Sequence, residues 1–99
     1  MSSKAERKAA WETVGKYHEE QLGELLGHVG EAVDRFRSGD LDAFDVDRVL
    51  FQYSRAAKEL WKFCNLGQVE FTASLIRGEL GENFELRNDW WESGRPRER

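Results

Sequence analysis

The fold of this chain is decided by residues 11–36, which read WETVGKYHEEQLGELLGHVGEAVDRF. Apolar side chains recur there at gaps of three or four, the spacing that places residues on one face of an α-helix. The stripe consists of Trp11, Val14, His18, Leu22, Leu25, Val29, Val33 and Phe36, in which only the histidine is polar. It predicts one long amphipathic helix from about Lys4 to Arg37, ended by the turn-forming residues Ser38-Gly39-Asp40.

Four glycines lie inside this expected helix, at positions 15, 23, 27 and 30. A glycine in a helix interior costs about 1 kcal/mol relative to alanine. We interpret the glycines as a bend or break between Gly23 and Gly30, in preference to the close approach of another helix. The first helix is therefore expected to change direction in that interval.

A second helix is expected to begin at Asp45, a good N-cap residue, with Phe44 packed against Val49 across the first turn. Its apolar stripe contains Val46, Val49, Leu50, Tyr53, Ala57, Leu60 and Cys64 and is widened by Trp61. Asn65-Leu66-Gly67 should end this helix, because Asn and Gly tolerate the left-handed backbone common at helix ends.

Residues 68–80 fit two patterns. A helical face would contain Val69, Thr72, Ala73, Ile76 and Leu80, whereas Val69, Phe71, Ala73 and Leu75 alternate as in a strand. A strand would find a partner only in Phe84-Glu85-Leu86, and a two-stranded hairpin is marginal on its own. We therefore expect a third helix here, followed from Gly81 onward by irregular chain.

These elements predict an all-α fold, a small three-helix bundle with a long first helix and an irregular C-terminal tail. Residues 1–94 are expected to form a single helical domain. Residues 95–99, which read Arg-Pro-Arg-Glu-Arg, are expected to form a mobile basic tail.

The first two helices differ in expected length, about 50 Å for the first if unbroken and about 28 Å for the second. The second helix is then too short to cover Trp11, Val14 and His18. Either the N-terminal turns fold back, or the segment containing Trp90-Trp91 covers these residues, or a second copy of the chain does.

Composition narrows the class of protein. The 99 residues are 39% apolar and 34% charged, and four Trp, six Phe and two Tyr supply enough area for one core. The formal charge of −4 argues against a nucleic-acid binder that acts through overall charge. We find no signal peptide, no run of about eighteen apolar residues for a membrane span, and no second cysteine for a disulfide. We therefore expect a cytoplasmic protein that does not enter a membrane.

Patterns typical of catalysis and metal binding are scarce. His18 and His28 are ten residues apart on one helix. Their side chains therefore point about 80° apart and cannot share a metal. The carboxylates at 40, 42, 45 and 47 lack the spacing of a calcium loop and suit the positive end of the second helix instead. With no nucleophile, phosphate-loop or dinucleotide motif, we expect no enzyme, no cofactor and no metal. Cys64 should be buried and unreactive.

The outer face of the second helix should carry a cationic strip, about 21 Å long. Its members follow one another at gaps of three or four: Arg48, Phe51, Arg55, Lys58 and Lys62. A solvated charged face is one interpretation. The functional interpretation is a docking strip for an acidic helix, such as Glu20, Glu24 and Glu31 of a second copy. Because Asp47 and Glu59 flank the strip, we rank protein partners ahead of nucleic acid.

Trp90 and Trp91 form the second candidate for partner binding. Adjacent side chains point in different directions, so both rings can be buried only where two surfaces meet. An aromatic clasp that closes the domain is the usual explanation. A partner anchor is the alternative, because tryptophan is enriched at binding hot spots. We expect one ring to be buried and the other to be partly exposed.

Two segments, Leu60-Trp61-Lys62-Phe63-Cys64 and Asp89-Trp90-Trp91-Glu92, resemble those of a group of short bacterial helical proteins of unassigned function. The resemblance covers roughly the second half of the chain. It implies a helical fold between the two segments, which favours the third helix over the hairpin, and it transfers no active site.

The function expected from these features is a non-enzymatic helical interaction module that forms a homodimer or binds another helical protein. One alternative is a small regulator, similar to an antitoxin or repressor, that contacts nucleic acid through the cationic strip and the arginine tail. Another is a small-molecule binder whose pocket is lined by Trp11, His18 and Trp61.

Overall fold

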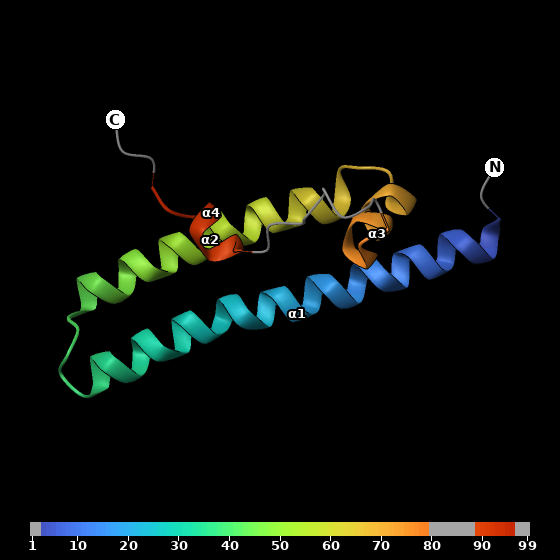
Figure 1. The fold of residues 1–99 in the computed structure, drawn as a ribbon. Coiled ribbons are helices and arrows are strands. Elements are labelled where there is room, and N and C mark those ends of the chain that lie inside the picture. The colour runs from blue at the N-terminus through green and yellow to red at the C-terminus, as the bar shows by residue number, and fades with distance from the viewer. Residues whose placement is uncertain (1–2, 80–88, 97–99) are drawn as a thin grey trace.

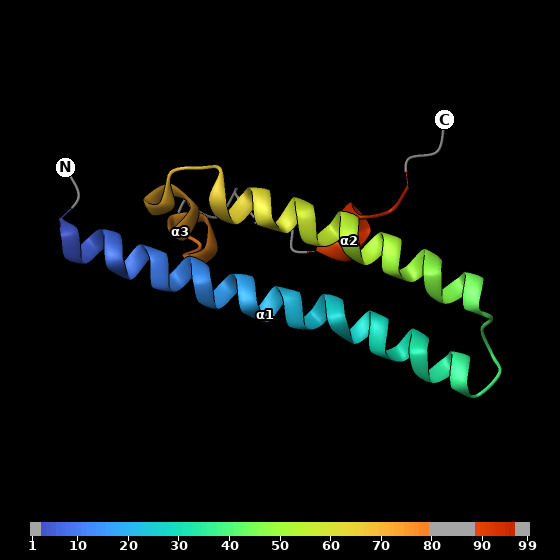
Figure 2. The same cartoon turned by 180° about the vertical axis from the view of Figure 1, so that it is seen from behind.

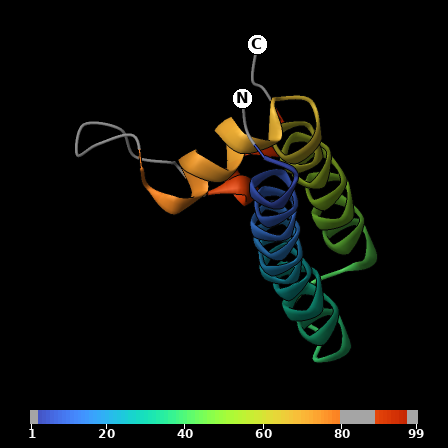
Figure 3. The same ribbon diagram turned by 90° about the vertical axis from the view of Figure 1, so that its right-hand side faces the viewer.

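The computed structural model describes residues 3–79 and 89–96, and 82% of these residues are helical, with no strand among them. Helix α1 (Lys4–Arg37) and helix α2 (Ala43–Asn65) form a long antiparallel hairpin (Figure 1). Helix α3 (Val69–Arg77) and the short helix α4 (Trp90–Ser93) lie on the same side of that hairpin (Figure 3). The expected all-α class with a long first helix is confirmed.

Helix α1 has the bounds that its apolar stripe predicts and runs without a break. Ser3 caps its start by accepting a hydrogen bond from the Glu6 amide at 3.0 Å. The expected bend between Gly23 and Gly30 is wrong, because the helix continues through both. A Cβ atom placed on any of the four glycines would meet no atom within 4 Å, so close approach by another described element is wrong as well. Packing along the apolar face outweighs the cost of the glycines.

Helix α2 begins one turn earlier than its sequence pattern suggests. Asp42 is the N-cap, and its carboxylate accepts the Asp45 amide at 2.8 Å while the Asp45 carboxylate accepts the Asp42 amide at 3.0 Å. The expected N-cap at Asp45 is therefore wrong, because this reciprocal arrangement satisfies two amides at once. The bond from the Asp42 amide also lowers the pKa of Asp45. The expected staple does not form, since Phe44 is 74% exposed.

Helix α3 confirms the helical interpretation of residues 68–80, although Leu80 and the alternative strand at 84–86 lie outside the described residues. Gly78 ends the helix with a φ of 72°, a left-handed conformation that glycine adopts without strain. The expectation of irregular chain after Gly81 is wrong at α4, where the Asp89 carboxylate accepts the Glu92 amide at 3.2 Å and caps a helical turn.

The core forms where α3 covers the N-terminal half of α1. Its buried members are Ala10, Val14, Tyr17, Leu25, Ala56, Leu60, Cys64, Val69 and Ala73. Arg77 fixes the crossing by donating to the Thr13 hydroxyl at 2.8 Å. Val14 is buried in this cluster, which includes Val69 and Ala73 of α3, a helix that none of the three expected arrangements included, whereas Trp11 remains 51% exposed.

Cys64 is buried in this core, as expected, and burial raises the pKa of its thiol from 9.0 to about 11. Only the thiolate reacts with alkylating reagents, so we expect labelling of the native protein at pH 8 to be about a hundredfold slower than labelling of the unfolded chain. A time course with a maleimide reagent, with and without urea, measures the ratio. Equal rates would place the thiol outside the core.

Candidate interaction surfaces

Residues 89–96 attach to the hairpin through Trp90. The indole Nε1–H of Trp90 donates to the Tyr17 hydroxyl at 2.8 Å, and its ring lies 5.3 Å from the ring of Phe63. Phe63 in turn meets Tyr17 edge-on, with ring centroids 5.9 Å apart. Burial raises the pKa of Tyr17, and the Trp90 hydrogen bond partly offsets this effect.

Trp91 attaches the same segment to the hairpin closer to its tip, at His28 of α1 and Gln52 of α2. Its ring stacks on His28, with centroids 4.2 Å apart and planes only 5° apart. Its carbonyl oxygen accepts a hydrogen bond from the Gln52 side chain at 2.9 Å. Both tryptophans are half-buried, so the expected contrast between one buried and one exposed ring is wrong. Each ring lies against a different aromatic group of the same chain, the geometry of a clasp.

Gly94 brings the backbone of the clasp into direct contact with α2. A Cβ atom at this position would lie 2.7 Å from the Ala56 nitrogen and 2.8 Å from the Ala56 Cβ, and it would also collide with the Gln52 carbonyl oxygen. The Gly94 carbonyl accepts a hydrogen bond from Arg55 Nε at 2.6 Å. We define the clasp as residues 89–96, held by Tyr17 and His28 on α1 and by Gln52, Arg55 and Ala56 on α2.

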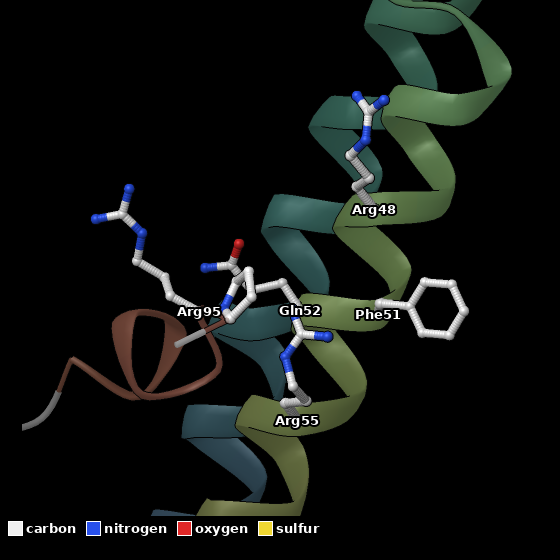
Figure 4. A pocket seen from close by; sticks show the side chains of 6 residues that line it. Arg48, Phe51, Gln52, Arg55 and Arg95 are labelled. Atoms are coloured by element: carbon white, nitrogen blue, oxygen red, sulfur yellow. The ribbon is translucent and has the colours of Figure 1, made fainter. Parts of the chain in front are cut away.

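The cationic strip lies on α2, but the clasp occupies part of it. Arg55 is half-buried by its bond to Gly94, whereas Phe51 is 58% exposed (Figure 4). Arg48 pairs with Asp45 at 2.9 Å, and Lys62 pairs with Glu59 at 3.3 Å. Lys58 is exposed. The strip is therefore not one uniform docking line, because its middle is built into an intrachain contact.

Two adjoining hollows open between the strip and the clasp, and Figure 4 shows the side chains that line the first of them. The first has a volume of about 690 Å³ and is lined by Arg48, Phe51, Gln52, Arg55, Arg95 and Pro96. The second, of about 590 Å³, is lined by Arg55, Lys58, Glu59, Ser93, Arg95 and Pro96. Sequence reasoning assigned Arg95 to a mobile tail and so missed its place opposite α2. Residues 97–99 of that tail lie outside the described residues.

The opposite side of the hairpin is covered by no described helix (Figure 2). Five large apolar side chains, each 46–53% exposed, lie there: Trp11, Leu26 and Phe36 of α1, and Leu50 and Trp61 of α2. On α1 they are rotated by about 80–180° from Tyr17 and His28, which contact the clasp. On α2 they are rotated by about 120–180° from the residues that contact the clasp. We call these five residues the open face.

Among the described residues, Asp47 is a charged side chain that borders the open face, at its end near the hairpin tip. The residues that lie between its five members are His18, Leu22, Val29, Val33 and Ala57, all half-buried. Near the hairpin tip, Phe36, Ala43, Val46, Asp47 and Leu50 line a hollow of about 180 Å³. Trp11, His18 and Trp61, expected to line a ligand pocket, all lie on this side. The sequence pattern placed Trp61 and Leu50 on the apolar stripe of the second helix. In the structure both are about half-exposed, and the side of α2 that carries Ala56 is buried instead.

No cluster of three or more His, Cys, Asp and Glu within residues 3–79 and 89–96 is placed to hold a metal ion. None of the helices in these ranges is both long and apolar enough to cross a membrane.

No family model matches the chain, and neither does any curated protein or solved structure at a significant level. The candidate surfaces therefore rest on their own geometry.

Proposed function

We propose that this chain is a non-enzymatic helical interaction module, a small three-helix bundle that self-associates through its open face. The observation that supports this function is the row of five half-exposed apolar side chains on one side of the α1–α2 hairpin. Charged side chains usually interrupt the solvated face of a helical hairpin, and large contiguous apolar patches mark sites of interaction.

The size of the open face suits a stable interface. Its two tryptophans, one phenylalanine and two leucines expose on the order of 600 Å² of apolar surface. That area lies at the upper end of the roughly 300–600 Å² found for the largest patch of a monomeric protein. With the half-buried residues between them, it approaches the roughly 800 Å² that each partner contributes to a standard interface.

A second copy of the chain is the partner that this surface fits best. Each copy has a formal charge of −4, so two copies repel each other least where they meet through an apolar face. An apolar face packed on its own symmetry mate buries both patches at once and gives a closed dimer. The hairpins would then pack as a four-helix layer, with α3 and the clasp outside.

The open face replaces the cationic strip as the proposed contact between copies. Arg55 of the strip already binds the clasp, and Phe51 is a single apolar residue among cations. Exposed ion pairs contribute only about 0–1 kcal/mol each, so the strip alone would not hold a dimer.

We place the protein in the cytoplasm, where a lone thiol such as Cys64 stays reduced.

Replacing Trp61 with Glu should abolish self-association, because each copy would bring a carboxylate into the symmetric interface and desolvate it there. We expect the dissociation constant to rise at least about a hundredfold. Phe51→Glu is the matched control, since Phe51 is exposed on the same helix but on another side. Sedimentation velocity at micromolar concentration gives the association state, and circular dichroism checks that both variants stay helical.

Two results would contradict this placement of the interface. A Trp61→Glu variant that associates as strongly as the unmodified chain would remove the open face from it. A Phe51→Glu variant that dissociates while Trp61→Glu does not would move the contact to the cationic strip.

A further inference from the structure

The two hollows beside the clasp concentrate positive charge in a chain that is acidic overall. Four basic side chains line them, namely Arg48, Arg55, Lys58 and Arg95. In the part of the chain that the structure describes, Glu59 is the one acidic residue that lines them, and it pairs with Lys62 at 3.3 Å. Arg55 and Arg95 line both hollows, so these form one continuous basic surface at the junction of α2 and the clasp. This concentration favours an anionic ligand.

Each of the three guanidinium groups makes a contact within the chain, and that of Arg55 is half-buried. The Arg55 Nε–H donates to the Gly94 carbonyl, which leaves the two terminal nitrogens of Arg55 outside that bond. Arg48 and Arg95 each direct one terminal nitrogen to a carboxylate, at 2.9 Å from Asp45 and 3.1 Å from Glu92. Because its side chain is already ordered by the bond to Gly94, Arg55 loses less side-chain entropy when it binds a planar or tetrahedral oxyanion.

The clasp supplies the geometry that the cationic strip lacks by itself. Gly94 packs against Ala56, and this close contact places Arg95, the next residue, across the hollow from α2. Arg48 and Arg55 lie two helical turns apart, about 10 Å along the axis. A single small anion is too short to contact both of them together with Arg95. A ligand with several adjacent negative groups would match this spacing.

We propose that these hollows bind a chain of phosphate groups, as carried by inorganic tripolyphosphate or by a nucleoside triphosphate. Guanidinium groups pair with phosphate oxygens in a bidentate manner, and neighbouring phosphates present such oxygens at short intervals. The acidic residues Asp45, Asp47 and Glu92 flank the surface and would repel a long nucleic acid that extends past it. The ligand is therefore a short polyanion that ends within the hollows.

Isothermal titration of the full chain with sodium tripolyphosphate, in magnesium-free buffer at low salt, tests this site. We expect saturable binding of one ligand per chain that weakens as salt is raised. Arg48→Gln, which replaces a residue that does not touch the clasp, should weaken the binding of tripolyphosphate about fivefold to tenfold. Arg55→Gln combined with Arg95→Gln should weaken it by more than tenfold. The matched control, Arg35→Gln with Arg37→Gln on α1, should leave the affinity within twofold.

Further titrations distinguish the sources of the phosphate chain. Equal affinity for tripolyphosphate and ATP would show that the phosphates alone are recognised, and tighter binding of ATP would add a contact to the nucleoside. The proposal is overturned if tripolyphosphate does not bind, or if Arg48→Gln and the double variant bind it like the unmodified chain. It is also overturned if hexaglutamate or a ten-nucleotide single strand binds more tightly, which would indicate an acidic peptide or nucleic acid.

Discussion

Replacing Gly15, Gly23, Gly27 and Gly30 together with alanine is expected to raise the free energy of unfolding by about 2–4 kcal/mol. All four lie in the middle of α1, are exposed, and would meet no atom within 4 Å if they carried a Cβ. Each alanine removes backbone freedom from the unfolded chain without strain in the folded one. Thermal unfolding at a fixed protein concentration should show a rise of more than about 10 °C.

Gly39→Ala is the matched control for this variant. Gly39 is also exposed, and a Cβ added to it would meet no atom within 4 Å, but its φ of 89° lies in the left-handed region. The same substitution should therefore lower the stability there by about 1 kcal/mol. An unchanged or lower melting temperature for the fourfold variant would mean that α1 bends at its glycines or packs against a partner there.

Gly94→Ala is expected to have the opposite effect and to lower the free energy of unfolding by about 2–3 kcal/mol. The φ of −89° suits alanine, so the cost is steric: the new methyl group meets the backbone of α2 at Gln52 and Ala56. Backbone atoms cannot move aside as a flexible side chain can. The clasp must then lift, which breaks the bonds from Gln52 and Arg55 to residues 91 and 94.

The loss of the clasp can be followed separately from the loss of stability. In the unmodified protein the Trp90 indole N–H is bonded to Tyr17, so its nuclear magnetic resonance signal should exchange slowly with water. Gly94→Ala should speed that exchange, whereas Ser93→Ala, at an exposed neighbouring position, should leave it unchanged. Slow exchange and full stability in Gly94→Ala would show that α4 does not rest on α2.

The helices of the hairpin were predictable because their signals are local. The apolar period of residues 11–36 and the turn at Ser38-Gly39-Asp40 determine α1, whose observed bounds match the expected ones. The glycines were misread because their cost of about 1 kcal/mol each is smaller than the stabilisation gained by packing the apolar face. The start of α2 was misplaced because both Asp42 and Asp45 are good caps, and only their reciprocal bonds show which is the N-cap.

The candidate surfaces were less predictable because they depend on contacts between distant residues. Trp90 meets Tyr17 across 73 positions, and Arg55 meets Gly94 across 39. The sequence indicated that Arg48, Phe51 and Arg55 share one face of α2, but not that the clasp would cover part of it. The sequence pattern also placed Trp61 near the core, whereas its side chain is about half-exposed. An apolar stripe that is widened by one residue does not show which of its two edges packs against the neighbouring helix.

Sedimentation equilibrium of the unmodified chain tests the open-face dimer most directly. The measurement should extend from about 1 to 100 micromolar, a range that brackets typical weak dimers. We predict that the weight-average mass rises with concentration toward twice the chain mass of 11.5 kDa and then levels off, as a closed two-fold interface requires. A mass that stays at 11.5 kDa over the whole range would contradict self-association through the open face.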